Sequence, residues 1–298
     1  MRVLVTGATG FVGQWLVPEL AAAGHEVLEA PPHPGFDIAD AAQVEDLIAA
    51  TRPDAVAHLA GVAFLPDAEK DPGLAERVNV GGTQAVFDAL DRLGSEPVVL
   101  VTSTADVYSP DAPLPIGEDA PLGPRSVYGR TKLRQDELAR RAGEAGRRVV
   151  VARAFNHIGP GQRPDFVVPG FARRVLELKA GRTDAIEVGS LAARRDFTDV
   201  RDVVRAYRLL LELEAAPGAS LLVVNIGSGR SVSMEEILRT LCSIAGVEPR
   251  WTVDPARLRQ NEILDRVADI ARIRSLTGWE PTIPLETSLR DVLAGTSG

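Results

Sequence analysis

The chain has 298 residues, of which 45% are hydrophobic and 25% are charged, and its formal net charge is −8. This length and composition are enough to bury the core of one large domain or two. The acidic balance is unlike that of proteins that bind the phosphate backbone of nucleic acids. The single cysteine, Cys242, excludes a disulfide framework, and the four histidines lack the spacing of metal ligands. We therefore expect neither a nucleic-acid partner nor a metal site.

Neither a signal peptide nor a membrane-spanning segment is predicted. The chain begins MRVLVTGATG, which is typical of a buried strand and lacks the longer apolar region and cleavage site of a signal peptide. No apolar run approaches the roughly 18 residues that indicate a membrane span. We expect a cytoplasmic protein with no membrane partner.

Short β-rich runs alternate with helical patterns through the first half of the chain. The runs at 3–6, 26–29, 55–59, 98–103 and 149–154 are predicted as strands, and helices are predicted at about 11–23, 41–50, 74–93 and 126–145. Alternation at this spacing predicts a parallel sheet with helices on both faces. Strands that are apolar on both sides fit such a doubly wound α/β sheet.

After residue 155 the pattern becomes less regular. Residues 155–170 are rich in Gly and Pro and are predicted as a loop, followed by a helix at about 167–180, a short strand at 186–188, a helix at about 199–214 and a further strand of the main sheet at 221–227. Two or three helices are predicted from residue 231 onward. The sequence thus predicts one domain over 1–160, to which about 192–227 return. About 161–191 and 228–298 are predicted to form a smaller α/β domain.

The first strand runs into a glycine-rich turn, VLVTGATGFVGQWL (3–16), with Gly7, Gly10 and Gly13 between strand and helix. Gly7 permits the tight turn, Gly10 lets the backbone approach a pyrophosphate, and Gly13 allows close contact of helix and strand. The free N–H groups of the helix N-terminus attract an anion. Because the triplet lies where the first strand meets its helix, it predicts a Rossmann fold that binds a dinucleotide.

The second strand leaves the choice of dinucleotide open. An acidic residue closing this strand would bind the ribose 2′-hydroxyl of NAD, whereas a basic residue would accept the 2′-phosphate of NADP. The sequence there is LEAPPHPG (28–35), in which Glu29 is followed by alanine, two prolines and His33. Neither signature is clean, so we expect NAD(P)H without a choice between the two forms.

Tyr128 and Lys132 lie four residues apart at the start of the predicted helix SVYGRTKLRQDELAR (126–140), and so share one face. A lysine cation beside a tyrosine stabilises the phenolate and lowers the pKa of the phenol. The tyrosine can then exchange a proton with a hydroxyl or carbonyl oxygen near neutral pH. Thr104 follows the fourth strand, at the edge where the carboxyl ends of parallel strands face the cofactor. Its hydroxyl is predicted to bond the same substrate oxygen.

Together these segments resemble the extended short-chain dehydrogenase/reductase family, the NAD-dependent epimerase/dehydratase group. The resemblance covers nearly the whole chain and includes GATGFVG (7–13), DIAD (37–40), HLAG (58–61), NVGGT (79–83), STADVY (103–108) and YGRTK (128–132). It implies that Tyr128 is the acid/base, that Lys132 binds the nicotinamide ribose and tunes the tyrosine, and that Thr104 takes the Ser/Thr role.

The resemblance also implies a set of cofactor-binding residues. Asp37 would contact the adenine with Ile38 beside the ring, and Asn79 would steady the loops beneath the cofactor. For His58 and Asn79 a satisfied polar group in the core is the alternative. The full set is Gly7, Thr9, Gly10, Phe11, Val12, Gly13, Asp37, Ile38, Leu59, Ala60, Gly61, Asn79, Tyr128, Lys132 and Phe155.

Segments of the second half resemble GDP-sugar members of the family, nearest to GDP-6-deoxy-4-keto-mannose reductases and GDP-mannose 4,6-dehydratases. These segments are residues 153–175, 194–207, LRQNE (258–262) and TGWEP (277–281). The resemblance implies that Asn156 lies near the sugar nucleotide and that Val168 and Pro169 border the base or sugar. Arg195 would hold the diphosphate, since a guanidinium matches phosphate geometry. Arg259 and Glu262 would hold phosphate and ribose hydroxyls, and a solvated charged face is the alternative for the arginines.

Asp106 stands two residues after Thr104, where dehydratases of the family carry a glutamate as the base at sugar carbon 5. The shorter aspartate reaches less far, which argues against dehydration. We therefore predict an enzyme that reduces the 4-keto group of a GDP-4-keto-6-deoxy-hexose with NAD(P)H, in which Tyr128 donates the proton and Asp106 is a further catalytic candidate. The alternatives are a GDP-mannose 4,6-dehydratase, an NDP-sugar 4-epimerase and, more distantly, a non-catalytic dinucleotide-sensing protein.

A homodimer is expected from the same resemblance. Relatives commonly pair through the helices at about 74–93 and 126–145. Val86, Leu90, Leu133 and Leu138 are the apolar residues on these helices that would face either a partner or the core.

Overall fold

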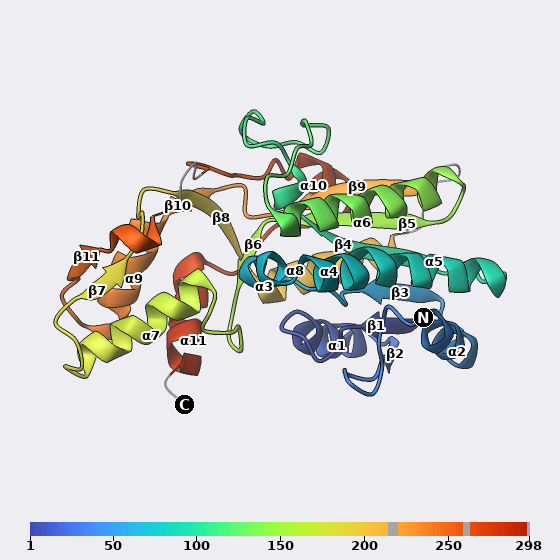
Figure 1. The fold of residues 1–298 in the computed structure, drawn as a ribbon, viewed down its shortest axis with the longest axis horizontal. Helices are drawn as coiled ribbons and strands as arrows, with labels where there is room; N and C mark the ends of the chain where they lie inside the picture. Colours follow the sequence, from blue (N-terminus) through green and yellow to red (C-terminus); the bar gives the residue numbers. More distant parts are fainter. Residues whose placement is uncertain (214–219, 259–262, 297–298) are drawn as a thin grey trace.

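The centre of the molecule is a six-stranded sheet in which every neighbouring pair is parallel, in the order β2-β1-β3-β4-β5-β9. The structure is a computed structural model that describes residues 1–213, 220–258 and 263–296. The strands are β1 (Arg2–Thr6), β2 (Glu26–Glu29), β3 (Ala55–His58), β4 (Val98–Thr104), β5 (Val149–Ala154) and β9 (Leu221–Ile226) (Figure 1). The predicted doubly wound α/β fold is confirmed, as are the strands predicted for the main sheet.

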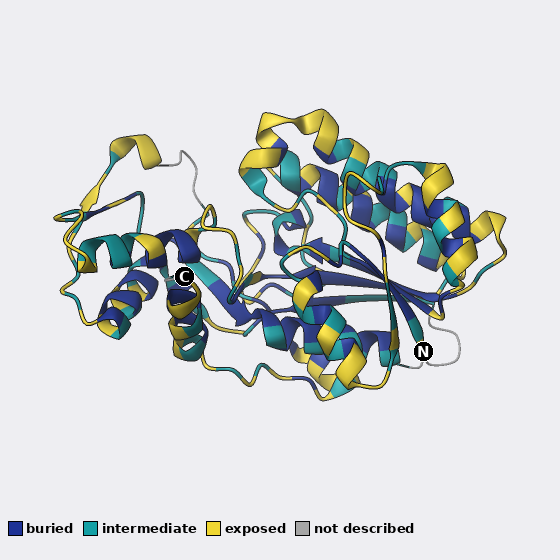
Figure 2. Ribbon diagram, turned by 90° about the horizontal axis from the view of Figure 1, so that it is seen from below, coloured by how far each residue is buried: buried dark blue, intermediate teal, exposed yellow. Residues whose placement is uncertain are grey.

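Helices cover both faces of this sheet (Figure 2). Successive residues of a strand point to opposite faces, so Val3 and Val5 enter the core beneath α1 (Gly13–Ala22) and α8 (Val200–Glu212). Leu4, between them, enters the core beneath α2 (Ala41–Thr51), α5 (Gly82–Arg92) and α6 (Val127–Glu144). This two-sided burial explains why the strands are apolar throughout.

The helix predicted at 74–93 is present but changes its winding. It is formed by α4 (Pro72–Glu76), a π-helical turn η1 (Arg77–Gly81) and α5, and the short α3 (Leu65–Lys70) precedes it. Single π turns inside α-helices are frequent at functional sites. In this chain the turn contains Asn79, whose side chain is fully buried.

A second group of elements lies beside the main sheet (Figure 1). Its strands are β6 (Asn156–Ile158), β8 (Arg194–Asp199) and β10 (Ser231–Ser233), in the order β10-β8-β6, and the pair β7 (Ile186–Val188) and β11 (Trp251–Val253). Its helices α7 (Val167–Lys179), α9 (Met234–Ala245) and α11 (Leu285–Thr296) enclose a separate hydrophobic core. The remaining turns and helix are η2 (Ala105–Val107), η3 (Pro255–Arg257) and α10 (Ala271–Thr277).

Two sequence-based expectations for this half were incomplete. The predicted loop over 155–170 contains β6, which pairs in parallel with β8, a strand that was not predicted. A three-residue strand has no periodicity of its own, and this one is stabilised by a partner about forty residues away in the chain.

Within the described residues, no helix is long and apolar enough to cross a membrane.

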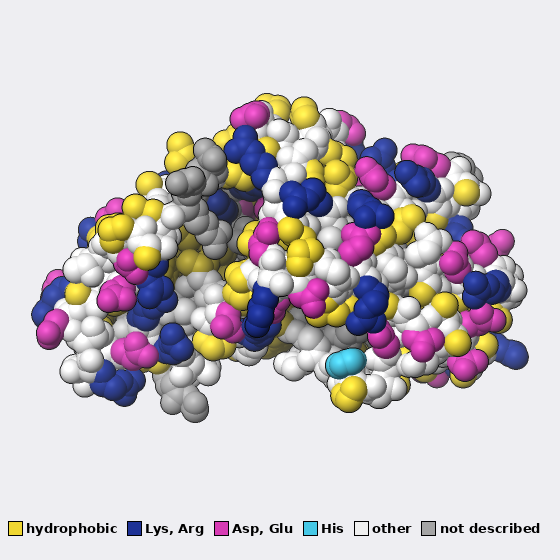
Figure 3. Space-filling model, viewed as in Figure 1, with side chains coloured by type: hydrophobic (Ala, Val, Ile, Leu, Met, Phe, Trp, Pro, Cys, Tyr) yellow, Lys and Arg dark blue, Asp and Glu magenta, His cyan; other side chains and the backbone are white. Residues whose placement is uncertain are grey.

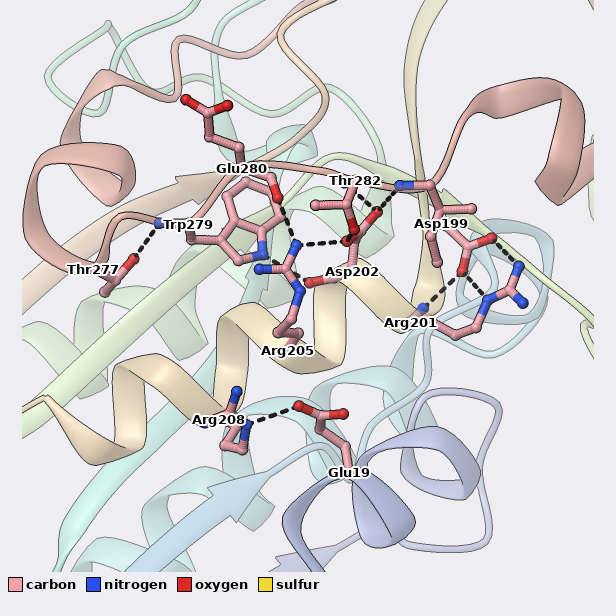
Figure 4. Close-up of polar contacts among 11 residues, drawn as sticks. Glu19, Asp199, Arg201, Asp202, Arg205, Arg208, Thr277, Trp279, Glu280 and Thr282 are labelled. Atoms are coloured by element: carbon pink, nitrogen blue, oxygen red, sulfur yellow. Dashed lines mark hydrogen bonds and ion pairs between the residues drawn. The ribbon is translucent and has the colours of Figure 1, made fainter. Parts of the chain in front are cut away.

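The TGWEP segment fastens the C-terminal part of the chain to α8 (Figure 4). The Asp202 carboxylate accepts hydrogen bonds from the backbone N–H groups of Thr282 and Ile283, at 2.9 and 2.8 Å. Trp279 is fully buried, and its indole N–H donates to the Asp202 carbonyl at 3.0 Å. The Arg205 guanidinium lies over the Trp279 ring, 5.8 Å from its centroid. This segment therefore has a structural role, and it fixes the chain that precedes it near the sheet.

Candidate active site

The glycine turn after β1 has the geometry that a dinucleotide phosphate requires. Gly7 has a φ of +71°, and its backbone carbonyl accepts a hydrogen bond from Gly10 N at 3.0 Å. A Cβ on Gly13 would lie 2.4 Å from the carbonyl oxygens of Gly7 and Ala8. No side chain caps the N-terminus of α1, which begins after Val12, so the positive end of the helix dipole is open to an anion. These residues fit the predicted dinucleotide.

The other residues predicted near the phosphates lie around the same turn. Thr9 is exposed, and the ring of Phe11 stacks on that of His157 with centroids 6.1 Å apart and an interplanar angle of 6°. Ala60 N donates to Thr6 Oγ1 at 3.2 Å, which holds the loop after β3 against the end of β1. Leu59, Ala60 and Gly61 are therefore brought next to the glycine turn, as the resemblance implied.

Asp37 and Phe155 make contacts within the protein that the sequence did not reveal. The Asp37 carboxylate pairs with Arg77 at 2.6 Å and accepts a hydrogen bond from Ala39 N at 2.9 Å. These two interactions, that from Ala39 first, lower the pKa of Asp37. Ile38 beside it is buried against Gly82. Because Asp37 is paired with Arg77, an adenine contact at Asp37 has to coexist with this ion pair. The Phe155 side chain is buried in the core beneath α8.

His58 and Asn79 are both satisfied polar groups of the core. The His58 ring lies within hydrogen-bond distance of Thr6 Oγ1 at 2.8 Å and Thr83 Oγ1 at 3.0 Å. Burial lowers the pKa of His58 to about 3, and the nearby Lys132 charge acts in the same direction. Asn79 Oδ1 accepts from Val62 N at 2.8 Å, which fixes the loop after β3. Both side chains therefore have partners within the core, as the alternative expected, and Asn79 also steadies this loop.

The first turn of α6 packs directly on the turn that follows β4. Ser126 caps the helix by accepting a hydrogen bond from Gly129 N at 2.9 Å. A Cβ on Gly129 would lie 2.8 Å from the carbonyl oxygen of Asp106, so only glycine permits this approach. As a result Tyr128 lies beside Thr104, whose side chain acts to lower the pKa of the phenol. The two side chains are thus close to each other, and their contact with one substrate oxygen stays a prediction.

The electrostatics of Tyr128 differ from the sequence-based expectation. Burial raises the pKa of Tyr128 well above its usual value, the Asp106 charge adds to this effect, and the hydrogen bond from Thr104 opposes it. The expectation that Lys132 lowers this pKa is not met here, because the Lys132 ammonium donates to Thr102 O at 2.6 Å and to Gln135 Oε1. Burial lowers the pKa of Lys132 itself to about 7, against the opposing charge of Asp136. Tyr128 is therefore a protonated phenol at neutral pH.

Asp106 is tied to a distant part of the chain. Its carboxylate lies 3.3 Å from a terminal nitrogen of Arg266, whose guanidinium also donates to the carbonyl oxygens of Ala105 and Tyr108. Arg266 is 5% exposed, whereas the Asp106 side chain is 42% exposed. The guanidinium thus fixes η2, the turn that follows Thr104, through its backbone carbonyls. Sequence reasoning missed Arg266 because no local pattern marks a contact across 160 residues.

A model of the NAD dependent epimerase/dehydratase family matches residues 3–227. The chain belongs to this family. GDP-6-deoxy-D-mannose reductase of Pseudomonas aeruginosa is 38% identical over 297 residues, covering 98% of this chain and 96% of that protein. UDP-glucose 4-epimerase of Azospirillum brasilense is 31% identical and is covered to 87%, with 94% of this chain aligned.

Solved structures of the family have the same fold. The structure of RMD from Pseudomonas aeruginosa complexed with NADPH superposes with a TM-score of 0.89 at 37% identity, over 99% of this chain and 98% of that one. The structure of Thermus thermophilus UDP-glucose 4-epimerase with NAD superposes with a TM-score of 0.85 at 28% identity, over 100% of this chain and 99% of that one. As a member of the family, the chain is an NAD(P)-dependent enzyme of nucleotide-sugar metabolism.

A hollow separates the two parts of the molecule in the surface view (Figure 3). Four of the predicted sugar-nucleotide residues belong to the second group of elements, on β6, α7 and β8. Asn156 is exposed at the start of β6, and Arg195 donates to the carbonyl oxygens of Arg194 and Ile263 at 2.7 and 2.8 Å. Val168 and Pro169 are buried in the second core, and Val167 is the exposed side chain at this helix start. Arg259 and Glu262 lie outside the described residues.

Proposed function

We propose that this chain reduces the 4-keto group of a GDP-4-keto-6-deoxy-hexose with NAD(P)H. In this proposal residues 1–160 and about 192–227 hold the dinucleotide, and about 161–191 and 228–298 hold the sugar nucleotide. Reduced nicotinamide supplies the hydride when it is bound. Tyr128 gives its phenolic proton to the oxygen at sugar carbon 4, Thr104 hydrogen-bonds the same oxygen, and Lys132 binds the nicotinamide ribose. The relative named GDP-6-deoxy-D-mannose reductase supports this choice of substrate.

The position of Tyr128 beside Thr104, where the first turn of α6 packs on the turn after β4, carries the proposal. Reduction of a ketone needs a proton donor, which a half-buried phenol with a raised pKa supplies. A 4-epimerase or a 4,6-dehydratase begins by oxidising carbon 4, and Tyr128 would then have to accept a proton as a phenolate. Burial and the adjacent Asp106 both disfavour that phenolate. The charge arrangement therefore favours the reductive direction.

The Asp106–Arg266 pair is a second argument against dehydration. A base at sugar carbon 5 must reach the substrate and be free to take a proton, whereas Asp106 shares its charge with a buried arginine 3.3 Å away. The arginine is in turn fastened to the carbonyl oxygens of Ala105 and Tyr108. A 4-epimerase remains the second candidate, because the Azospirillum brasilense relative carries that name at 31% identity.

The direct test supplies the purified protein with GDP-4-keto-6-deoxy-mannose and either NADH or NADPH. We expect stoichiometric loss of reduced-nicotinamide absorbance with formation of a GDP-6-deoxy-hexose. The cofactor that is oxidised faster decides between NAD and NADP, which the residues after β2 left open. No loss with either cofactor contradicts the proposal. Formation of the 4-keto sugar from GDP-mannose without added cofactor would identify a dehydratase instead, and interconversion of 4-epimers without net cofactor loss would identify an epimerase.

Asp106→Asn is expected to keep reductase turnover within about tenfold of wild type, because ketone reduction needs no base at carbon 5. If Asp106 were a catalytic base, the same change would cost about 10²–10⁴-fold. Steady-state kinetics with the keto-sugar distinguishes the two results. Asp111→Asn, an exposed aspartate in the following loop, is the matched control.

We also propose a homodimer through the outer sides of α5 and α6. Val86 and Leu90 are buried within the chain and belong to its own core, so they cannot face a partner. Leu133 and Leu138 of α6 are both half-buried. Leu133 packs against the chain's own core, so Leu138 is the better candidate of the two for such a contact. Sedimentation velocity is expected to give twice the chain mass. Leu138→Arg is expected to shift the protein to the monomer, and a wild-type monomer at micromolar concentration would contradict the proposal.

A further inference from the structure

Lys132 is a cation in an unusually dry position. The residue is 6% exposed, and its ammonium donates to Thr102 O at 2.6 Å and to Gln135 Oε1. Among the described residues these are its two acceptors, so one of its three N–H groups is left for a ribose hydroxyl or for Tyr128. The titratable groups whose charges act on it are His58 from β3 and Asp136 from its own helix, on which Tyr128 lies one turn earlier. Its position and its charge therefore depend strongly on the few polar atoms around it.

Gln135 is the side-chain acceptor of the Lys132 ammonium, and sequence reasoning did not identify it. It lies one turn after Lys132 on α6 and is fully buried. Its amide Nε2 donates to Thr83 Oγ1 of α5 at 2.8 Å, while its Oε1 faces the ammonium. The side chain thus bridges two helices and presents its oxygen to Lys132.

The surrounding hydrogen bonds fix this orientation. Thr83 Oγ1 donates its own proton to Asn79 O at 2.8 Å, so its lone pairs accept from Gln135 and from His58 Nε2, which lies 3.0 Å away. His58 then carries its proton on Nε2 and accepts from Thr6 on Nδ1 at 2.8 Å. If the Gln135 amide were reversed, its NH₂ group would face the ammonium, and two donors would meet. Its oxygen would face Thr83, whose hydroxyl proton is already donated to Asn79 O. The chain of bonds holds Gln135 in one direction.

We propose that Gln135 is a positioning residue for the reaction proposed above: its amide, anchored on Thr83, holds the Lys132 ammonium charged and in place beside Tyr128 and the site of the nicotinamide ribose. Neutral His58, at the far end of the same hydrogen-bond chain, adds no competing positive charge. The inference rests on the proposed function for its consequence in catalysis. The effect of Gln135 on Lys132 can be measured without any substrate.

The composition of the chain makes that measurement direct. Its three lysines are Lys70, Lys132 and Lys179, and the other two are exposed. Protein labelled with ¹³C at lysine Cε therefore gives three resonances, one of which belongs to the buried residue. We expect Gln135→Met, which removes the acceptor at similar volume, to lower the pKa of Lys132 by about 1. Gln135→Glu places a carboxylate at the ammonium and is expected to raise it.

If the reaction needs charged Lys132, the pH dependence of turnover should shift together with the pKa of Lys132. Because a lysine is charged below its pKa, activity that depends on this charge is lost as pH rises through about 7 in wild type. The loss moves to lower pH in Gln135→Met, with turnover about tenfold lower above neutral pH, and to higher pH in Gln135→Glu. A merely structural role would lower turnover without moving the pH profile.

Gln84→Met is the matched control, because Gln84 is an exposed glutamine of α5 whose amide bonds Asp88 at 2.7 Å. It is expected to leave both the resonance and the profile unchanged. A Lys132 titration that is identical in wild type and both Gln135 variants overturns the inference, as does a shifted titration with an unmoved pH profile. Gln135→Glu decides the question alone if the methionine variant does not fold. A wild-type protein without reductase activity contradicts the proposed function, and the resonances then decide on Gln135.

Discussion

Replacing Tyr128 with phenylalanine is expected to lower kcat/KM for the keto-sugar by about 10²–10⁴-fold, the usual contribution of a positioned proton donor. The phenol that is lost carries the proton and the hydrogen bond with Thr104. The ring remains at the start of α6, so the affinity for NADPH should stay within a few-fold of wild type. Steady-state kinetics and a fluorescence titration of the reduced cofactor separate the two effects.

Tyr207→Phe is the control for this experiment. Tyr207 is a fully buried tyrosine of α8, and the nearby Tyr128 contributes to raising its pKa, so this change removes a second hydroxyl close to the site but leaves the proposed donor in place. We expect turnover of the control to remain close to wild type. If Tyr128→Phe turns over as fast as the control, Tyr128 does not donate the proton.

Asp136→Ala is expected to destabilise the protein by about 3–5 kcal/mol, the range for a buried ion pair that loses one partner. The Asp136 carboxylate pairs with Arg153 at 2.8 Å and accepts from Ser103 Oγ at 2.9 Å, with both charged side chains almost completely buried. Asp136 also raises the pKa of Arg153, which stays charged when its partner is removed. Thermal unfolding should show a Tm lower by on the order of 10 °C.

The surface pair of the same helix gives the comparison. Arg140 and Glu144 lie 3.9 Å apart with exposed side chains, so Glu144→Ala should cost less than about 1 kcal/mol. An Asp136→Ala protein as stable as Glu144→Ala would mean that Arg153 finds another partner. Because Asp136 and Lys132 lie on the same helix, the ion pair also fixes the helix that carries the proposed catalytic residues.

The parallel main sheet, with helices on both faces, and its glycine turn could be predicted from the sequence because both depend on short-range patterns. The strands of the main sheet alternate with helices at regular spacing, and Gly7 has the positive φ that its turn requires. Thr104 and Tyr128 could be paired because the carboxyl ends of parallel strands meet at one edge. The short strands β6 and β8 could not be predicted, since each is stabilised by pairing with a remote segment.

What the sequence by itself determined was the fold class, the family motifs and the identity of Tyr128, Lys132 and Thr104 as candidates. Only the tertiary structure decided their electrostatics, because burial depends on every element packed around α6. It raised the pKa of Tyr128, lowered that of Lys132 and brought Arg266 to Asp106. It also placed Gln135 between Thr83 and Lys132, a contact among three residues on two helices. Local patterns fix which chemical groups are present, whereas desolvation and long-range contacts fix their charge and their partners.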